Sequence, residues 1–245
     1  AAVHPHAITF IPVSALQGDN IVSPSPRMPW YQGPALLDFL EQVPLSDREH
    51  GQPFRFPVQL VLRPHLDFRG YAGQISAGTV QVGDAVTALP SGRRSSVRSI
   101  ATFDGELIQA RCGQSVTLLL NDEIDVSRGD MLVKPDQLPT VGQELRAQIC
   151  WMVDEPLKKG GQYLLKHTTQ TVTALALGLE GKVDIQSLGQ APTEQLALNE
   201  IGVVVLKLKK PIYYDVYSEN RITGSFILID ELSNATCGAG MILKK

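Results

Sequence analysis

From Gly51 onward, the sequence is a succession of short runs rich in β-branched and apolar residues, with no helical period. Turn residues such as Gly83-Asp84 and Pro90-Ser91-Gly92 separate the runs. The first set of runs covers residues 56–62, 70–75, 85–89, 96–103, 114–120 and 131–133. Short strands at regular spacing are typical of a small closed barrel or a sandwich, and closure removes the edge strands that promote aggregation.

A second set of β-type runs follows a polar, proline-containing stretch at 134–142, which is a candidate linker. Its runs cover residues 145–153, 162–167, 169–177, 202–208, 226–229 and 235–243. The two sets share a plan but no sequence repeat. The sequence therefore predicts a mainly β protein with two consecutive antiparallel barrels, at 52–137 and 142–245.

The first 50 residues have a different pattern. His6–Val13 predicts a buried strand, and the three prolines of Ser23–Pro29 exclude regular structure there. Pro34–Val43 predicts a helix that begins at Pro34. One face of this helix is apolar: Leu36, Leu37, Leu40 and Val43. Because one strand and one helix cannot bury a core, we interpret residues 1–50 as the end of an α/β domain and expect them to be loosely held.

Composition limits the classes of function. The chain has 245 residues, 22 basic against 25 acidic side chains, a net charge of −3 and no dense Lys/Arg block, and this composition argues against a nucleic-acid-binding protein. No apolar run reaches the ~18–20 residues of a membrane span. The three cysteines have no zinc-site spacing and predict reduced thiols: Cys112, Cys150 and Cys237. With no signal peptide visible, we expect a cytoplasmic protein without a metal. A start at Ala1 and not at Met indicates a processed chain or a fragment.

Three short motifs each allow a functional and an ordinary interpretation. Ser14-Ala15 follows a predicted strand, so it is either a turn whose N–H groups contact a purine or a plain turn. Arg63–Gly70 is either an acid–base cluster or a hairpin loop, and we favour the loop. Asp122–Asp125 lacks the ligand spacing of a metal loop and predicts a solvated turn. No phosphate loop, dinucleotide motif or nucleophile elbow occurs, so we expect no catalytic residues.

Four stretches together resemble the large GTPase subunit of bacterial sulfate adenylyltransferase (ATP sulfurylase), a relative of elongation factors Tu and 1-alpha. They cover essentially the whole chain. They are Phe10–Asn20 with Met28–Gly33, Arg63–Gly73 leading to Gly83-Asp84, Thr102–Gly105 through Asp122–Asp130, and Asn199–Tyr217 with Asn220–Thr236 and Gly238–Gly240. The last two stretches are more specific than a general translation-factor barrel.

The resemblance implies an N-terminal GTPase domain followed by two barrels. It also implies a small catalytic subunit that makes adenosine 5′-phosphosulfate from ATP and sulfate, driven by GTP hydrolysis on the large subunit. Some members of the family continue into an adenylylsulfate kinase. The GTPase body has no counterpart here, and only the guanine-contacting turn matches, at Ser14, Ala15 and Leu16. We therefore expect GTP and magnesium in the full-length subunit, neither on this chain, and no activity from this chain alone.

Two alternatives remain open at this stage. One is a pair of elongation-factor barrels that bind aminoacyl-tRNA. The net charge of −3 and the stretch Asn220–Asp230 argue against it. The other is a stand-alone double barrel that only binds other proteins, which the sequence does not exclude.

Overall fold

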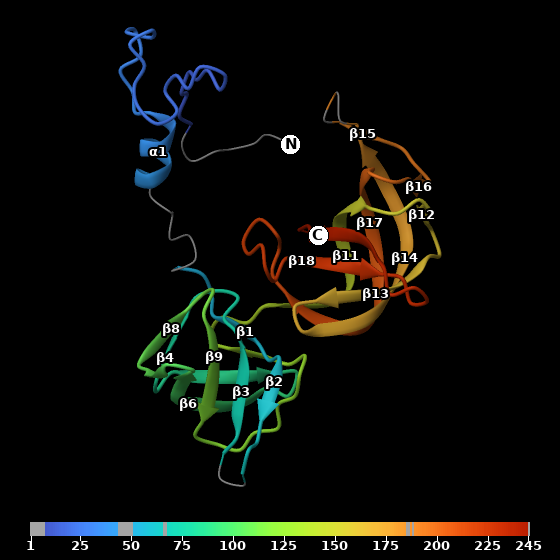
Figure 1. The fold of residues 1–245 in the computed structure, drawn as a ribbon. Helices are drawn as coiled ribbons and strands as arrows, with labels where there is room; N and C mark the ends of the chain where they lie inside the picture. The colour runs from blue at the N-terminus through green and yellow to red at the C-terminus, as the bar shows by residue number, and fades with distance from the viewer. Residues whose placement is uncertain (1–7, 44–50, 66–67, 185–186, 188, 245) are drawn as a thin grey trace. The chain divides into compact units, whose positions relative to one another are not determined.

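The computed structural model describes residues 8–43, 51–65, 68–184, 187 and 189–244. The chain divides into two compact units, residues 1–47 and 48–245. In the described residues, the first unit contains one helix and the second contains all the strands (Figure 1).

The helix of the first unit, α1, spans Leu36–Gln42 and is shorter than predicted. Pro34 lies before the N-cap residue Ala35, which makes no capping bond with its side chain. The backbone N–H of Leu36 instead donates to the carbonyl oxygen of Asn20 at 2.9 Å. The helix therefore begins where a polar loop satisfies its free N–H groups, as helix starts require. The predicted apolar face forms, but Leu40 is 59% exposed.

The strand predicted over His6–Val13 is wrong for the described part of that run. Residues 8–13 form no strand, and Phe10 is 83% exposed; His6 and Ala7 lie outside the described residues. The physical reason is that an isolated strand is not stable without a neighbour to receive its backbone hydrogen bonds. A β-branched run shows the tendency to be a strand but does not supply that neighbour.

The first sheet of the second unit forms a half-barrel, and its two end strands, β1 and β2, follow one another in the chain. Its antiparallel strands follow the order β1-β10-β5-β6-β9-β3-β2, with β7 beside β6, and β4 pairs with β8 separately. Only Val58 and Gln59 separate β1 from β2. The backbone N–H of Val58 donates to the carbonyl oxygen of Asp130 at 2.8 Å, and that of Gln59 donates to the carbonyl oxygen of Ala72 at 2.9 Å. The strand bounds are β1 Arg55–Pro57, β2 Leu60–Leu62, β3 Gly70–Gln74, β4 Thr79–Gln81, β5 Ala85–Leu89, β6 Arg93–Thr102, β7 Gly105–Leu107, β8 Gln109–Arg111, β9 Ser115–Leu120 and β10 Met131–Val133.

The second sheet is a ring of six strands. Its order is β13-β18-β19-β11-β17-β14-β15, and pairing of β13 with β14 closes the ring. A two-stranded ribbon of β12 and β16 accompanies it. The strand bounds are β11 Thr140–Trp151, β12 Leu157–Lys158, β13 Gln162–His167, β14 Gln170–Val183, β15 Gln190–Ala191, β16 Gln195–Leu196, β17 Ile201–Tyr214, β18 Ser225–Ile229 and β19 Thr236–Ile242. Together the two sheets confirm the predicted mainly β fold.

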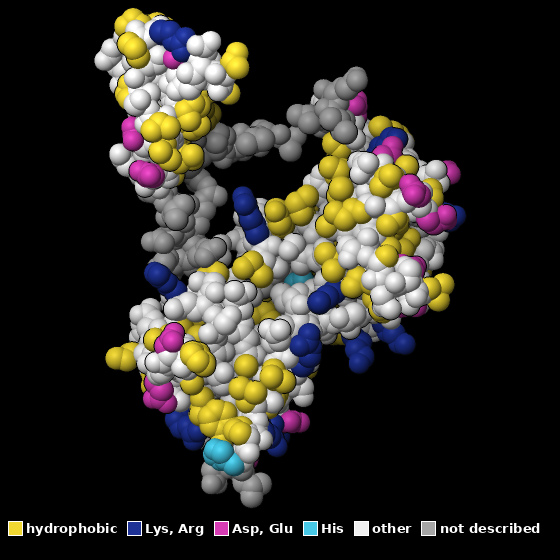
Figure 2. Space-filling model, in the orientation of Figure 1, with side chains coloured by type: hydrophobic (Ala, Val, Ile, Leu, Met, Phe, Trp, Pro, Cys, Tyr) yellow, Lys and Arg dark blue, Asp and Glu magenta, His cyan; other side chains and the backbone are white. Residues whose placement is uncertain are grey.

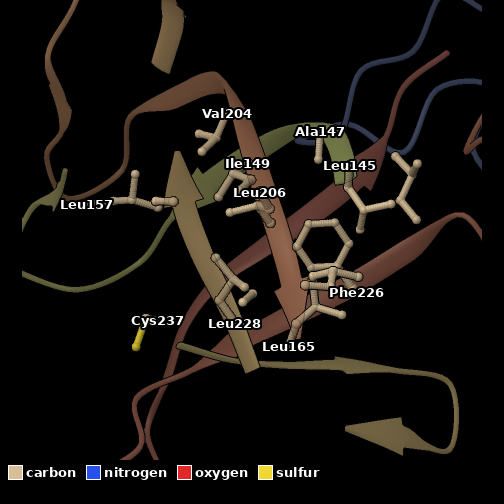
Figure 3. Close-up of a cluster of buried hydrophobic side chains, with 14 of the residues drawn as sticks. Leu145, Ala147, Ile149, Leu157, Leu165, Val204, Leu206, Phe226, Leu228 and Cys237 are labelled. Carbon is tan, nitrogen blue, oxygen red and sulfur yellow. The ribbon is translucent and has the colours of Figure 1, made fainter. Parts of the chain in front are cut away.

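Each sheet encloses its own apolar core. In the second, the inward side chains of β11 alternate with partly exposed ones: Leu145, Ala147, Ile149 and Trp151 are all buried. They meet Leu206 and Phe226 from other strands in the cluster that Figure 3 shows. The first sheet encloses a similar cluster around Phe56, Ile100 and Leu118. This alternation follows from the two-residue period of a strand with one buried face.

The differences from the predicted strands are mostly at short elements. Strands of two or three residues, such as β4, β7, β8 and β12, have too few residues to show a period. The connection between the two sheets is shorter than the predicted linker 134–142, because β11 already begins at Thr140.

Candidate functional site

The predicted turn Ser14–Leu16 opens a tight loop of the first unit. The carbonyl oxygen of Ser14 accepts the N–H of Gly18 at 2.8 Å, and Ser14 N–H donates to the carbonyl of Asp19 at 3.3 Å. Gly18 has a φ of +74°, which glycine adopts without strain. Ala15 and Leu16 are exposed, and within the described residues their backbone N–H groups donate no hydrogen bond. Those two N–H groups are therefore available to an acceptor atom of a ligand.

Buried polar side chains hold this loop in place. Oδ1 of Asp19 accepts the hydroxyl of Ser25 at 2.6 Å and the Nε and Nη2 groups of Arg27 at 3.0 and 2.8 Å. The Ser25 hydrogen bond, and then the Arg27 guanidinium, lower the pKa of Asp19. Asn20 is only 1% exposed; its Nδ2 donates to the Pro12 carbonyl at 2.9 Å and its Oδ1 accepts Ser25 N–H at 2.7 Å. The loop is thus preformed by hydrogen bonds.

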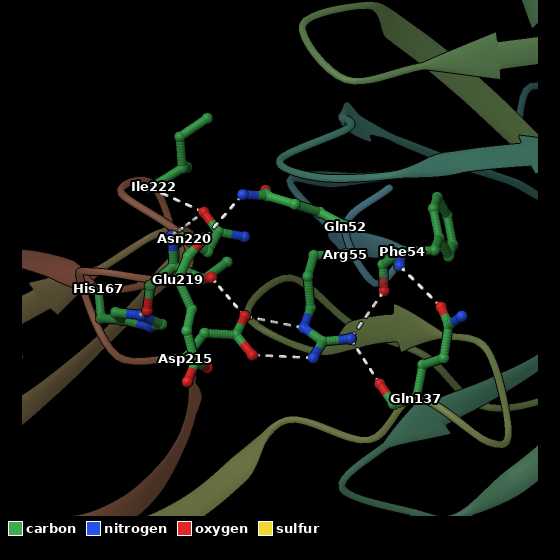
Figure 4. A network of polar contacts seen from close by, with 10 residues as sticks. Gln52, Phe54, Arg55, Gln137, His167, Asp215, Glu219, Asn220 and Ile222 are labelled. Atoms are coloured by element: carbon green, nitrogen blue, oxygen red, sulfur yellow. Dashed lines mark hydrogen bonds and ion pairs between the residues drawn. The ribbon is translucent and has the colours of Figure 1, made fainter. Parts of the chain in front are cut away.

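A second polar cluster lies where the two barrels meet, within the second unit (Figure 4). Arg55, on β1, is 2% exposed, and its guanidinium donates to both carboxylate oxygens of Asp215 at 2.9 and 2.8 Å. Its Nη1 also donates to the carbonyls of Phe54 at 3.0 Å and Gln137 at 2.5 Å. This bidentate ion pair is largely shielded from solvent and fixes one geometry, so it aligns the first barrel with the loop that follows β17.

That loop, residues 215–224, is itself built around Asn220. Its Oδ1 accepts the N–H groups of Ile222 at 2.9 Å and Thr223 at 3.2 Å. The Thr223 hydroxyl donates to Asp215 at 2.6 Å, and Gln52 of the first barrel donates to the Glu219 carbonyl at 2.6 Å. Both barrels therefore hold the loop.

His167, the last residue of β13, lies beneath the same loop. It is 1% exposed, and its Nε2 lies 2.7 Å from the Thr223 carbonyl oxygen. A carbonyl oxygen only accepts, so Nε2 carries the proton and donates it. Burial lowers the pKa of His167, and the Thr223 hydrogen bond and the Asp215 charge oppose that shift. The imidazole is therefore a neutral structural donor at pH 7.

The other predicted motifs do not form a site in the described structure. Arg69 pairs with Asp125 at 3.2 Å, and Asp122 accepts the hydroxyl of Ser95 at 2.8 Å, so both serve local structure; Asp67 lies outside the described residues. No group of three His, Cys, Asp or Glu side chains in the described part suits a metal ion. Cys112, Cys150 and Cys237 form no disulfide. No described helix is long and apolar enough to span a bilayer.

Sequence reasoning missed the Arg55–Asp215 pair. The available signal was an arginine between Phe54 and Phe56, directly before the strand run predicted over residues 56–62. A buried charge requires a partner, but that partner lies 160 residues away. On the face that Figure 2 shows, apolar and charged side chains are interspersed over both barrels.

Comparisons with known proteins agree on the family to which the chain is similar. The model of the GTP-eEF1A C-terminal domain-like family matches residues 144–243. Sulfate adenylyltransferase subunit 1 of Alteromonas mediterranea is 47% identical over 236 residues, which are 96% of this chain and 50% of that protein. Bifunctional enzyme NodQ of Rhizobium meliloti is 47% identical over 96% of this chain and 37% of its own length. The chain thus spans about half or less of these curated relatives.

A solved structure supports the fold. Sup35 complexed with GMPPNP superposes with a TM-score of 0.73 over 95% of this chain and 57% of that chain, at 23% identity. At that identity the match shows the arrangement of the barrels and nothing about ligands.

Proposed function

Because this chain belongs to the family of sulfate adenylyltransferase subunit 1, we propose that it is the two-barrel part of a regulatory GTPase subunit. In that enzyme, GTP hydrolysis drives the synthesis of adenosine 5′-phosphosulfate from ATP and sulfate, and a small catalytic subunit performs the adenylation. The observation that carries the proposal is 47% identity along 96% of the chain to a protein named sulfate adenylyltransferase subunit 1.

The nucleotide part of the proposal concerns Ser14, Ala15 and Leu16. In the whole subunit, the free N–H groups of Ala15 and Leu16 would donate to the guanine carbonyl oxygen, on a loop that Asp19 and Asn20 hold in shape. These residues suit a base but not phosphates or magnesium, because the sequence has no phosphate loop. One or two hydrogen bonds contribute about 0.5–1.5 kcal/mol each. We therefore expect this chain alone to bind no GTP or magnesium and to be inactive.

The barrels, in this proposal, contact the small catalytic subunit and transmit the nucleotide state to it. The Arg55–Asp215 pair and the hydrogen bond from Gln52 to the Glu219 carbonyl support this role, because they tie the two barrels together. Two tied barrels can rotate as one body against a GTPase domain, a common form of switching. A fused or associated adenylylsulfate kinase is a further partner that the family resemblance implies.

Calorimetric titration of this chain with the small catalytic subunit, at physiological salt, tests the proposal. Binding in the micromolar range or tighter, about −8 kcal/mol or more, supports a contact on the barrels. Binding only by the full-length large subunit would place the contact in the other half of that subunit. No binding by either would contradict the assignment. A parallel titration with tRNA checks the elongation-factor alternative, since affinity that falls steeply with salt would favour it.

A further inference from the structure

A hollow of about 560 Å³ lies on the outside of the second barrel, over β13, β18, β19 and β11. Its floor is a row of directly paired residues: Lys166 pairs with Ile227, Ile227 with Ala239, and Ala239 with Cys150. Directly paired residues point to the same side of a sheet, and the last three of these are partly exposed. The outer face of a barrel is usually polar, so this apolar row is a surface that another molecule can cover.

The charge of the hollow has one sign. Lys166 and Arg221 line it, both exposed, and neither side chain has an ion pair or hydrogen bond within the described residues. No Asp or Glu is among the residues that line it. Two unpaired cations beside a low-dielectric apolar floor attract a negatively charged partner.

One wall of the hollow is rigid. Arg221 lies in the loop of residues 215–224, where Asn220 Oδ1 accepts two backbone N–H groups. Gly224 closes this loop so tightly that an added Cβ would lie 2.5 Å from the Asn220 carbonyl oxygen. Because the same loop carries Asp215, the partner of Arg55, a molecule in the hollow contacts the loop that the first barrel also holds. A preformed wall reduces the entropy lost on binding.

We propose that this hollow, the Lys166–Arg221 groove, binds an acidic and apolar segment of the small catalytic subunit. Carboxylates of that segment pair with Lys166 and Arg221, and an apolar side chain covers Ile227 and Ala239. The identity of the partner rests on the proposed function. The observations favour a protein segment over a free anion, because a small anion would pair with the cations and leave the apolar floor exposed.

The test compares three forms of the chain in calorimetric titration with the small catalytic subunit. K166E/R221E reverses the two charges of the groove and is expected to weaken binding by about tenfold or more, because like charges then face each other. K159E/K209E makes the same change in net charge at two exposed lysines that form no ion pair with any described residue and lie outside the groove. It is expected to bind within about twofold of wild type. Raising the salt concentration should weaken wild type more than K166E/R221E.

Ala239→Trp tests the apolar floor without changing charge. It fills the groove from a partly exposed position and is expected to weaken binding by about tenfold, with thermal unfolding of each variant as the check on folding. If K166E/R221E binds as tightly as K159E/K209E, the proposed binding at the groove is contradicted, whereas the proposed contact of the barrels with the small catalytic subunit is not. If wild type itself does not bind, the groove and the proposed contact on the barrels both fall.

Discussion

The first unit and the β-barrels stabilise themselves by different means. Between residues 8 and 43, Ala35 is the single buried apolar side chain, and the loop is organised by hydrogen bonds to Asp19 and Asn20. Large apolar side chains there, such as Phe10 and Trp30, are exposed. The barrels bury two large apolar clusters and a small third one, in which Met131 and Val133 of β10 meet Tyr213 of β17. Their chief ion pair, Arg55–Asp215, belongs to none of these clusters.

The difference teaches what each kind of contact contributes. Hydrogen bonds are directional and define the shape of a loop, but each adds only about 0.5–1.5 kcal/mol net. Burial of apolar surface has no direction but contributes about 25 cal/mol per Å², so closed sheets gain most of their stability from it. We therefore infer that the first unit has a defined shape and little stability of its own, whereas the barrels have both.

Removal of Arg55 is expected to have the largest effect on this comparison, because the loss of one hydrogen-bonding residue then lowers the free energy of unfolding of the barrels. Arg55→Met leaves the carboxylate of Asp215, whose side chain is 13% exposed, without its cation. The expected loss in the free energy of unfolding is about 3–5 kcal/mol. Urea unfolding of R55M, D215L and R55M/D215L measures it. The double variant should recover most of the loss, since no unpaired charge remains, and a double variant as unstable as R55M would contradict this reasoning.

A matched pair of leucines sharpens the comparison. Leu206 is fully buried in the second barrel, whereas Leu40 on α1 is 59% exposed. Leu206→Ala should lower the free energy of unfolding by about 2–5 kcal/mol, because it removes buried methyl groups and leaves a cavity. Leu40→Ala should change it by less than about 0.5 kcal/mol. Both values come from urea unfolding under one set of conditions. A comparable loss in L40A would mean that the helix face is covered in solution.

The barrels were more predictable from sequence than the first unit, and for the same physical reason. The runs at 85–89, 131–133 and 162–167 reappear as β5, β10 and β13 with the predicted bounds, because alternation and turn residues are local signals. His6–Val13 has an equally good local signal but no neighbouring strand in the described residues. A local pattern reports a preference, and the partner that satisfies it is a property of the fold.

Sites were harder to predict than strands. The turn Ser14–Leu16 was identified by resemblance, and its role stays a prediction. The Arg55–Asp215 pair and the Lys166–Arg221 groove each combine residues from distant parts of the chain, so no window of sequence contains them. Only the family-specific stretch Asn220–Asp230 pointed to the region, since it includes the loop that forms one wall of the groove.

A pH titration tests the buried polar residues of the barrels. Its expected effect on the free energy of unfolding is smaller than that of the substitutions at Arg55 and Leu206. The pKa of His167 is lowered from 6.5 by burial, so between that lower value and 6.5 the unfolded chain binds a proton that the folded chain does not. The free energy of unfolding should therefore fall as the pH drops below about 6.5. His167→Gln removes the titrating group and should flatten this part of the curve. Urea unfolding between pH 7.5 and 5 measures both, and equal slopes would show that other groups cause the loss.

The smallest global effect is expected from the residue that most organises the first unit. Asn20 has a φ of +55° and holds Pro12 and Ser25 through its side chain. Asn20→Gly keeps that backbone conformation available and removes the side-chain hydrogen bonds to Pro12, Met28 and Ser25, so it separates their loss from backbone strain. We expect no measurable change in the unfolding of the barrels, because no described side-chain hydrogen bond of Asn20 reaches beyond the first unit.

Hydrogen exchange of individual amides is the measurement that detects the local effect of Asn20→Gly. The Leu36 and Leu37 amides, which donate to the carbonyls of Asn20 and Ile21, should exchange faster in the variant. In wild type they should already exchange faster than amides of β11 and β17, because local opening of α1 exposes little buried apolar surface. Wild-type α1 amides as protected as those of the barrels would show that the two regions unfold together, and the comparison would then fail.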